Sequence, residues 1–453
     1  MALVQASASQ SATNGQTEYR EKLEAKYAKL IEERPHFRLL VTYVPNKDEP
    51  IHRWFPYREG FSATLVRTLF TEFEAKPGHS VILDPFTGCG TTLVEASRFG
   101  CESWGVDMLP VAAFVAQVKA QSLQHHDVAY LRERAQTLLD VPVTLPIHRG
   151  PVDVRILQHA YAEPVLNDLL SLKEQILLEP NVYARDFLLL GLLSILEEIS
   201  FTRKDGQYLR MVPNKYIPSV RAVLTRQYAE MLRDLDMPIR NHQYSFFPHG
   251  EQLSLLSHED IAPVHVSLGD ARALHSHIHE GIDIAITSPP YLNRFDYSRT
   301  YSLELCLHFV ENFAGLRDVR HSLLRSHIES KDAPTNHAQS AELDEILANL
   351  GAQELNNNRI PIMVRGYFED MFHFVEQLAI VCNPGARIAL VVGNTRFAGE
   401  LIPVDLMLSE LAGRVGFVTD KVIVTRYKGN SSQQMGRFGR IPVRESILFW
   451  RKP

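Results

Sequence analysis

The sequence predicts an α/β protein with a doubly wound, mostly parallel sheet, an antiparallel C-terminal strand and a helical insertion. Short runs of β-branched and apolar residues alternate with helical stretches, which implies parallel strands covered by helices. A glycine-rich turn joins a predicted strand to a predicted helix within residues 81–100. Residues 417–427 and 445–452 predict two antiparallel strands at the end of the chain.

The bulk composition is that of a globular protein. The 453 residues exceed one ordinary core, so we expect two or three domains or one core with large insertions. Hydrophobic residues make up 45% and charged residues 22%, and no apolar run approaches the roughly 18 residues of a membrane span. The net charge of −6 neither favours nor excludes nucleic acid, because binding needs only a local basic face.

The four cysteines lie at positions 89, 101, 306 and 382 and form no CxxC pair. This spacing argues against a disulfide framework and against a cysteine zinc site. We therefore expect no metal and a reducing, cytoplasmic setting.

The first 48 residues predict an arm followed by a helix. Residues 1–16 are rich in Ser, Ala, Gln and Thr and poor in apolar side chains, which is typical of a disordered arm. Residues 17–34 combine strong helix formers with apolar residues at helical spacing, and Pro35 predicts the end of that helix. The first half of the core is expected at residues 49–115.

Residues 81–100 (VILDPFTGCGTTLVEASRFG) predict a buried strand, a tight turn and a helix. Gly88 and Gly90 leave room for the backbone to approach a ligand, and the free N–H groups of the helix N-terminus point into the same space. Asp107 ends the next strand about 20 residues further on, the spacing at which a carboxylate holds ribose hydroxyls. This pattern favours an adenosine-bearing cofactor over an ordinary strand-end carboxylate.

Residues 116–262 predict a Leu-rich helical insertion, a candidate for DNA binding and target recognition. Within it, SFTRKDGQYLR (residues 200–210) places two aromatic residues among Arg203, Lys204 and Arg210. Basic residues with interleaved aromatics suit a nucleic-acid backbone and exposed bases. A solvated loop between helices is an equally weighted alternative.

The stretch IDIAITSPPY (residues 282–291), in the catalytic part of the core expected at 263–314, predicts a strand that stops at Ser288. The two prolines that follow lack N–H donors and restrict the residues before them. The result is a rigid turn, the SPPY turn, which carries a small hydroxyl and the ring of Tyr291. Such a turn suits holding a flat group, although a plain Pro-rich turn is the simpler reading.

The last third of the chain predicts a mobile second insertion at residues 315–362 and the C-terminal part of the core at 363–453. Between the final two strands lies KGNSSQQMGRFGRIPVR, which holds no acid. It is the clearest basic patch in the sequence and carries Lys428, Arg437, Arg440 and Arg444.

Four features directly follow predicted strands: the glycine loop, Asp107, Asp270 at the end of a strand expected at 264–271, and the SPPY turn. Because ligands in open α/β sheets bind beyond the carboxyl ends of the strands, all four should face one rim. One side of that rim would hold a nucleoside-type cofactor, and the other would present the SPPY turn to a flat substrate.

DPFTGCGTT, the acidic end of the next strand, and TSPPY together resemble the motifs of amino-group DNA methyltransferases that use S-adenosylmethionine. SPPY, rather than DPPY, is similar to the cytosine-N4 members. HRWFPYREGF (residues 52–61) resembles the segment that closes over the methionine end of the cofactor. The resemblance covers roughly 50–110, 264–300 and 365–450. It implies a Rossmann-like methyltransferase fold, duplex DNA as substrate, and a cognate restriction endonuclease or defence-system subunit as partner.

The resemblance also implies roles for individual residues. Ser288 and the carbonyls beside Pro289 would accept hydrogen bonds from the amine of the base, and Tyr291 would stack on the base. Asp107 would hold the ribose and Asp270 the adenine amino group. The implied catalytic set is Ser288, Pro289, Pro290 and Tyr291, and the implied cofactor set is Asp84, Phe86, Gly88, Gly90, Thr91, Thr92, Asp107, Asp270 and Tyr57.

The chemistry agrees with these residue types. Accepting the N–H bonds of an exocyclic amine favours a pyramidal nitrogen that can attack an activated methyl group, so alignment and electrostatics supply most of the rate. Stacking offsets the cost of flipping the base out of the duplex. The chain has no Pro-Cys pair, so we do not expect carbon-5 methylation. Adenine N6 in DNA, a base in RNA, or a non-catalytic nucleic-acid-binding subunit of the same fold remain alternatives.

Overall fold

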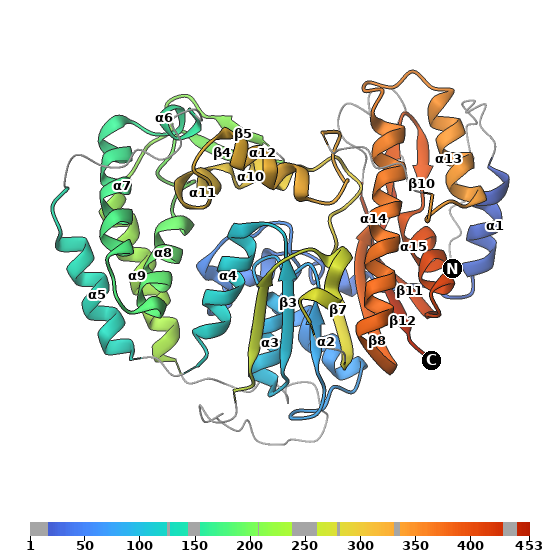
Figure 1. Ribbon diagram of the computed structural model, residues 1–453, viewed down its shortest axis with the longest axis horizontal. Coiled ribbons are helices and arrows are strands. Elements are labelled where there is room, and N and C mark those ends of the chain that lie inside the picture. Colours follow the sequence, from blue (N-terminus) through green and yellow to red (C-terminus); the bar gives the residue numbers. More distant parts are fainter. Residues whose placement is uncertain are drawn as a thin grey trace, which may run out of the picture.

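The computed structural model describes residues 17–124, 127–143, 155–206, 208–237, 261–278, 281–329, 336–428 and 442–453. Its centre is an eight-stranded sheet with the order β1-β11-β12-β8-β7-β2-β3-β6 (Figure 1). The strands are β1 (Ile31–Glu33), β2 (Ile82–Asp84), β3 (Ser103–Asp107), β6 (Val264–Leu268), β7 (Ile282–Thr287), β8 (Cys382–Gly393), β11 (Val418–Lys428) and β12 (Val443–Arg451).

The sheet is parallel except for β12, which runs antiparallel to both β8 and β11. The mostly parallel sheet and the antiparallel C-terminal strand predicted from the sequence are therefore confirmed. β7, which leads into the SPPY turn, lies between β2 and β8 at the centre of the sheet. A central parallel strand is covered on both faces, which explains why its sequence is almost continuously apolar.

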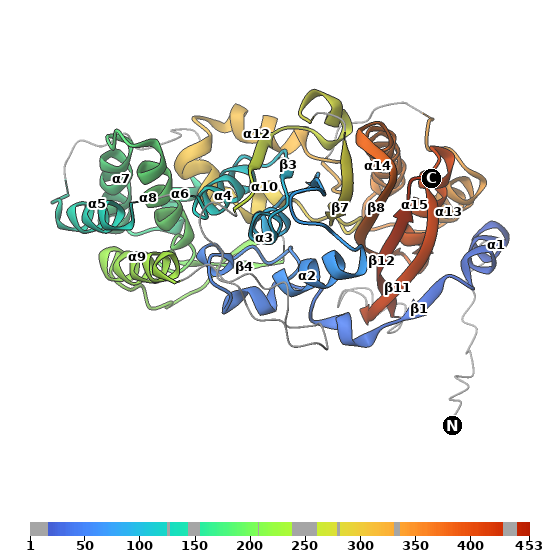
Figure 2. The same cartoon turned by 90° about the horizontal axis from the view of Figure 1, so that it is seen from below.

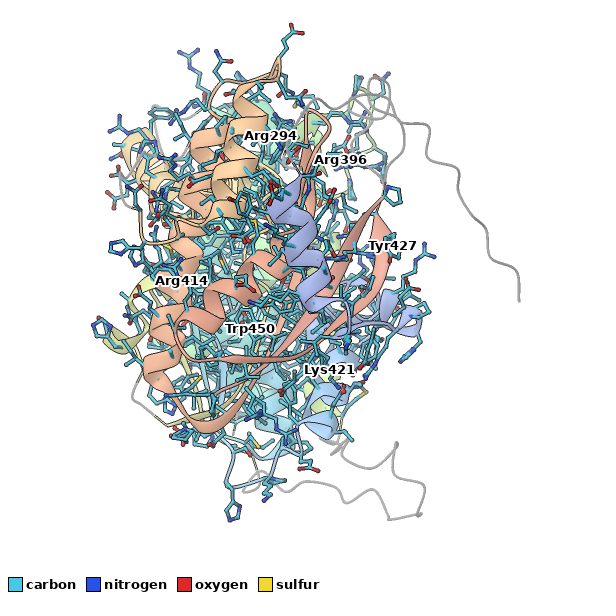
Figure 3. The ribbon with its side chains drawn as sticks, turned by 90° about the vertical axis from the view of Figure 1, so that its right-hand side faces the viewer. Arg294, Arg396, Arg414, Lys421, Tyr427 and Trp450 are labelled. Carbon is cyan, nitrogen blue, oxygen red and sulfur yellow. The ribbon has the colours of Figure 1, made fainter. Side chains whose placement is uncertain are left out.

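Helices cover both faces of the sheet (Figures 1 and 2). Ile284 and Ile286 of β7 pack in the cluster that contains α2 (Ala63–Glu72). Ala285 faces the opposite cluster, which contains α14 (Ile360–Val381) and α15 (Val404–Arg414). On that face Trp450 of β12 is buried under α15 and donates a hydrogen bond to Ser409 at 3.3 Å (Figure 3).

The remaining core helices flank the strands in chain order. They are α1 (Glu18–Tyr27), α3 (Thr91–Phe99), α4 (Pro110–Gln121), α10 (Tyr297–Thr300), α11 (Ser302–Glu304), α12 (Phe313–Ser322) and α13 (Ala341–Gly351). A short antiparallel pair, β9 (Thr395–Phe397) and β10 (Glu400–Ile402), follows β8. No helix in the described ranges combines the length and apolarity needed to cross a membrane.

The helical insertion predicted between β3 and β6 forms a layer beside α4 (Figure 1). It consists of α5 (Val128–Asp140), α6 (Ile156–Ala160), α7 (Glu163–Leu177), α8 (Val182–Ser194), the hairpin of β4 (Thr202–Asp205) and β5 (Tyr208–Met211), and α9 (Val220–Asp236). The stretch expected as an inter-helix loop or a nucleic-acid contact is thus this β4–β5 hairpin.

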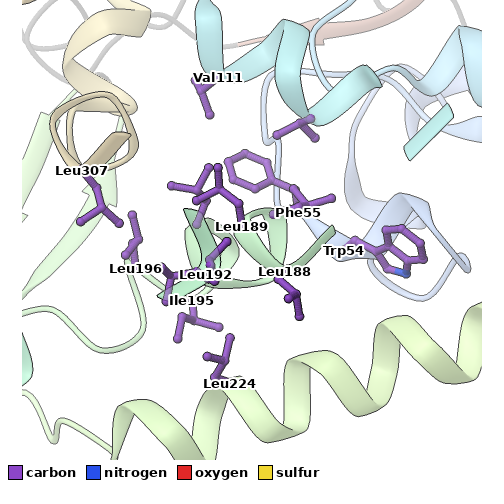
Figure 4. Packing of buried hydrophobic residues seen from close by; sticks show 14 of the residues in the cluster. Trp54, Phe55, Val111, Leu188, Leu189, Leu192, Ile195, Leu196, Leu224 and Leu307 are labelled. Atoms are coloured by element: carbon purple, nitrogen blue, oxygen red, sulfur yellow. The ribbon is translucent and has the colours of Figure 1, made fainter. Parts of the chain in front are cut away.

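The insertion shares its core with the segment that precedes the glycine loop. Trp54 and Phe55 pack in one cluster with Leu188 and Leu192 of α8 (Figure 4). Asp234 of α9 accepts hydrogen bonds from the indole N–H of Trp54 and from the backbone N–H of Ile51, both at 2.9 Å. The insertion therefore fixes the position of this segment against the cofactor half of the sheet.

Two sequence predictions need correction. The helix expected over residues 17–34 ends at Tyr27, and Ile31–Glu33 instead forms β1, because its backbone pairs in parallel with Val422–Val424 of β11. The mobile insertion expected at 315–362 contains α12, α13 and the start of α14. The apolar face of α13 is buried against α14, which the mixed composition concealed. The arm predicted at 1–16 lies outside the described residues.

Candidate active site

A cavity of about 800 Å³ lies beyond the carboxyl ends of β2, β3 and β7. Its wall combines the glycine loop, the segment before it, the SPPY turn and the end of α12. The lining residues are Tyr57, Glu59, Gly60, Phe61, Asp84, Pro85, Phe86, Thr87, Gly88, Cys89, Thr91, Asp107, Met108, Leu109, Ala271, Ser288, Pro290, Tyr297, Leu323, Leu324 and Ser326. The convergence predicted from the strand ends therefore holds for the glycine loop, Asp107 and the SPPY turn.

The two glycines of the loop have different roles. Gly88 lines the cavity at a φ of 52°, and a Cβ there would lie 3.0 Å from Cε1 of Tyr57. Gly90 has a φ of 80°, and its Cβ would meet the Cα of Ala116 on α4 at 2.9 Å. The first glycine thus allows an aromatic ring to cover the loop, and the second allows α3 to pack closely on α4.

Two of the predicted carboxylates are held by the ends of their own strands. Asp107 accepts hydrogen bonds from the backbone N–H groups of Gly88 and Leu109, both at 2.8 Å. Asp84 accepts a hydrogen bond from the hydroxyl of Thr287 at 2.6 Å, so β2 and β7 are joined beside the SPPY turn. Burial raises the pKa of Asp84 to about 7 and the pKa of Asp107 to about 6.

The lining of the cavity is negatively charged. Glu59, Asp84 and Asp107 are its three carboxylates, and none of its lining residues in the described ranges is Lys, Arg or His. Glu59 was not predicted, although it lies within the HRWFPYREGF block. Its Oε2 accepts a hydrogen bond from the hydroxyl of Tyr301 at 2.6 Å. A cavity of this kind favours a ligand with positive charge.

Other predicted cofactor residues stand at or behind the wall. Tyr57, Phe86 and Thr91 line the cavity. Thr92 is buried behind it and donates a hydrogen bond to the carbonyl of Ile286 at 3.3 Å. Asp270, expected to hold an adenine amino group, is instead engaged by the guanidinium of Arg272, and its neighbour Ala271 lines the cavity.

Sequence reasoning missed the wall contributed by Leu323, Leu324 and Ser326. These residues follow α12 in the segment expected to be mobile. Arg325 fixes them, because its backbone N–H and its guanidinium both donate to the buried Asp370 of α14 at 2.7 Å. The only local signal was a pair of leucines in a polar stretch.

The SPPY turn is divided between the cavity and the last strands of the sheet. Ser288 and Pro290 line the cavity, and the Ser288 hydroxyl donates to the Val391 carbonyl at 3.1 Å. Pro289 is buried behind them. Tyr291 donates a hydrogen bond to Glu445 at 3.1 Å and lies against Gly393, where a Cβ would be 3.1 Å from the ring. The ammonium of Lys428 lies over the same ring, 5.2 Å from its centroid.

The basic residues of the hairpin point to opposite sides. Arg203 and Arg210 are exposed and pair directly across the two strands, and Arg210 also forms an ion pair with Asp205 at 3.2 Å. Lys204, between them in sequence, is buried and contacts Glu304 at 2.6 Å. The sequence grouped these three cations together, whereas the alternation of β4 leaves only the two arginines on the outer face.

The basic residues of the C-terminal patch are also divided. Lys428 forms an ion pair with the buried Glu445. Arg444 is held by Asp405 at 2.6 Å and by Glu24 at 2.9 Å, and its side chain is 15% exposed. Both are therefore already neutralised within the fold. Arg437 and Arg440 lie outside the described residues.

The strand order, the glycine loop and the acidic residues ending β2 and β3 define a Rossmann-like methyltransferase fold. No protein-family model matches the chain. The chain is 34% identical to the type II methyltransferase M.BsoBI of Geobacillus stearothermophilus, over 95% of this chain and 92% of that protein. It is also 34% identical to the type II methyltransferase M.AvaI of a Nostoc strain, over 92% and 89%. The chain therefore belongs to the type II methyltransferase family.

Among solved structures, the rRNA methyltransferase AviRa of Streptomyces viridochromogenes aligns over 90% of this chain and 92% of its own length. The identity is 10% and the TM-score is 0.33. This likeness is too loose to bear on the site, which is assigned from its own geometry.

Proposed function

We propose that the protein transfers a methyl group from S-adenosylmethionine to the exocyclic N4 amine of cytosine in duplex DNA, as the modification enzyme of a restriction-modification or phage-defence system. The observation that carries this proposal is the cavity at the strand ends, with its three carboxylates and its opening at Ser288 and Pro290. S-adenosylmethionine bears a sulfonium and an ammonium against one carboxylate, so its net charge complements this lining.

The cavity offers a distinct partner for each part of such a cofactor. Asp107, which ends β3, is placed to accept ribose hydroxyls. The apolar side chains of Met108, Leu109 and Leu324 form a wall suited to an adenine ring. Thr91 begins α3, whose N-terminal N–H groups favour a carboxylate. The cofactor would bring a methyl group that is already activated by its sulfonium.

Ser288 is suited to accept a hydrogen bond from the amine of a base. Its hydroxyl proton is directed to the Val391 carbonyl, so the lone pairs of the same oxygen are available to an incoming N–H group. Methyl transfer then forms an N–C bond, breaks the C–S bond with its electron pair left on sulfur, and releases one amine proton. A neutral acceptor in place of a carboxylate supports cytosine as the target base.

Tyr291 supports stacking on the target base, provided that the ammonium of Lys428 leaves the face of its ring. A DNA phosphate near the turn would attract that ammonium. Arg203 and Arg210 form the best described phosphate contact, since like charges placed directly opposite across two strands destabilise the hairpin unless an anion joins them. Arg437 and Arg440 are proposed contacts from the sequence alone.

The product of the reaction tests this proposal. Duplex DNA is incubated with the protein and S-adenosylmethionine, digested to nucleosides and analysed by mass spectrometry. We expect N4-methyldeoxycytidine from the wild type and a large loss with Ser288→Ala. N6-methyldeoxyadenosine would reassign the acceptor, and methylation of RNA in preference to DNA would reassign the substrate. Arg132→Ala, on the exposed face of α5, serves as a control that should keep full activity.

A further inference from the structure

Glu59 occupies the part of the cavity wall that covers the glycine loop. It follows Tyr57, whose ring lies on Gly88, and it precedes Gly60 and Phe61, which also line the cavity. The side chain is half-buried. Its carboxylate therefore stands on the side of the cavity where the glycine loop passes into α3.

Tyr301 holds Glu59 in place from a distant part of the chain. Its hydroxyl donates to Oε2 of Glu59 at 2.6 Å. The ring of Tyr301 is fully buried and stacks on Tyr57, with centroids 5.1 Å apart and planes 9° from parallel. A ring packed in this way fixes the direction of its hydroxyl, so the Glu59 carboxylate is preorganised.

Lys204 of the β4–β5 hairpin closes the other side of the Tyr301 ring. Its ammonium lies 4.1 Å from the ring centroid and 2.6 Å from Oε1 of Glu304. The backbone carbonyl of Lys204 accepts a hydrogen bond from Arg58 at 2.8 Å. The helical insertion thus clamps both Tyr301 and the residue next to Glu59.

The three carboxylates of the cavity differ in what remains for a ligand. Each oxygen of Asp107 accepts a backbone N–H, and Asp84 bridges β2 to Thr287. These two acids follow strands and face the floor of the cavity. Glu59 comes from the opposite wall, beside the N-terminus of α3, which favours a carboxylate. A carboxylate acceptor next to a helix N-terminus complements the paired ammonium and carboxylate of an amino acid.

We propose that Glu59 accepts hydrogen bonds from the α-ammonium group at the amino-acid end of the cofactor, and that Tyr301 is the residue that positions it. This inference rests on the proposed function, because it assigns a role within the same cofactor site. It also gives the insertion a second role, as the support of one end of the cofactor pocket.

Two ligands that differ in the amino-acid group test the inference by calorimetry. S-adenosylhomocysteine carries the α-ammonium, whereas 5′-methylthioadenosine lacks the whole amino-acid group. Glu59→Gln should weaken binding of S-adenosylhomocysteine by about 10-fold or more, the range of a charge-assisted hydrogen bond, and leave 5′-methylthioadenosine within about twofold of wild type. Glu133→Gln, an exposed change of equal charge on α5, should alter neither affinity.

Tyr301→Phe separates positioning from folding, because it keeps the stacked ring and removes only the hydroxyl. We expect a smaller loss, about threefold to tenfold, again confined to S-adenosylhomocysteine. Equal losses for both ligands, or no loss with Glu59→Gln, would overturn the inference. A wild-type protein that binds neither ligand would overturn the proposed cofactor itself, and that result is distinct from a loss of selectivity.

Discussion

The hydroxyl of Tyr291 donates a hydrogen bond to Oε1 of Glu445 across 3.1 Å, which joins the SPPY turn to the last strand of the sheet. Glu445 is buried and also forms ion pairs with Arg426 and Lys428. Gly393, the partner of Glu445 in the strand register, supplies the flat surface beneath the ring. The aromatic side chain of the turn is thus oriented by residues more than 100 positions away in sequence.

This anchor predicts different effects for two substitutions of Tyr291. Tyr291→Phe keeps the ring and loses one hydrogen bond, so kcat should fall by less than about 10-fold. Tyr291→Ala loses the stacking surface, so kcat should fall by at least about 100-fold while the Kd for S-adenosylmethionine stays within about threefold of wild type. Single-turnover methylation and calorimetry measure the two quantities. A matching loss of cofactor affinity in both variants would assign Tyr291 to the cofactor pocket instead.

The site could be predicted from sequence where its chemistry is local. The prolines after Ser288, the glycine loop and Asp107 each announce a strand end within a few residues, and parallel strands bring such ends together. Glu59 and Tyr301 are separated by 242 positions, and no local pattern joins them. Arg444 appeared as a surface cation because Glu24, its partner across the fold, lies 420 positions away.

The raised pKa values of Asp84 and Asp107 predict a pH-dependent cofactor affinity. Burial raises them to about 7 and about 6 from an ordinary 3.8, so the free protein favours the protonated forms. That contribution to stability is complete below the unfolded pKa and is lost as the pH rises through the folded values. A cationic ligand favours the ionised forms, so binding near pH 6.5 should release protons and affinity should rise with pH.

Calorimetry in two buffers of different ionisation enthalpy measures this release. At about pH 6.5 the apparent binding enthalpy should depend on the buffer, and at about pH 8.5 it should not. Asp107→Asn should reduce the proton release at the lower pH. A buffer-independent enthalpy at about pH 6.5 in the wild type would show that neither carboxylate titrates with cofactor binding.

Gly90 predicts a stability effect larger than its conformation alone would give. Gly90→Ala places a Cβ in the left-handed region and 2.9 Å from the backbone of α4, so the free energy of unfolding should fall by about 3 kcal/mol or more. Gly78 has a similar φ of 70°, but no atom lies within 4 Å of its Cβ position. Gly78→Ala should therefore cost only about 1–2 kcal/mol. Equal losses in urea unfolding would contradict the proposed contact between α3 and α4.

The hairpin of the insertion predicts how DNA binding responds to salt. Arg203 and Arg210 lie on the outer face of β4–β5, whereas the ammonium of Lys204 is sealed against Glu304 and Tyr301. Replacing both arginines by alanine should weaken DNA binding and reduce the slope of log K against log salt by about 2, since each phosphate contact contributes about 0.9. Arg444→Ala, whose cation is already paired with Asp405 and Glu24, should leave that slope unchanged.

Fluorescence anisotropy with a labelled duplex, titrated at several salt concentrations, gives these slopes directly. The double variant should retain the affinity of the wild type for S-adenosylmethionine, because neither arginine lines the cavity. An unchanged slope in the double variant would remove the hairpin from the DNA interface. The basic residues at 437 and 440 would then be the next to test, and the hairpin would keep only its contact with Tyr301 on the inner face.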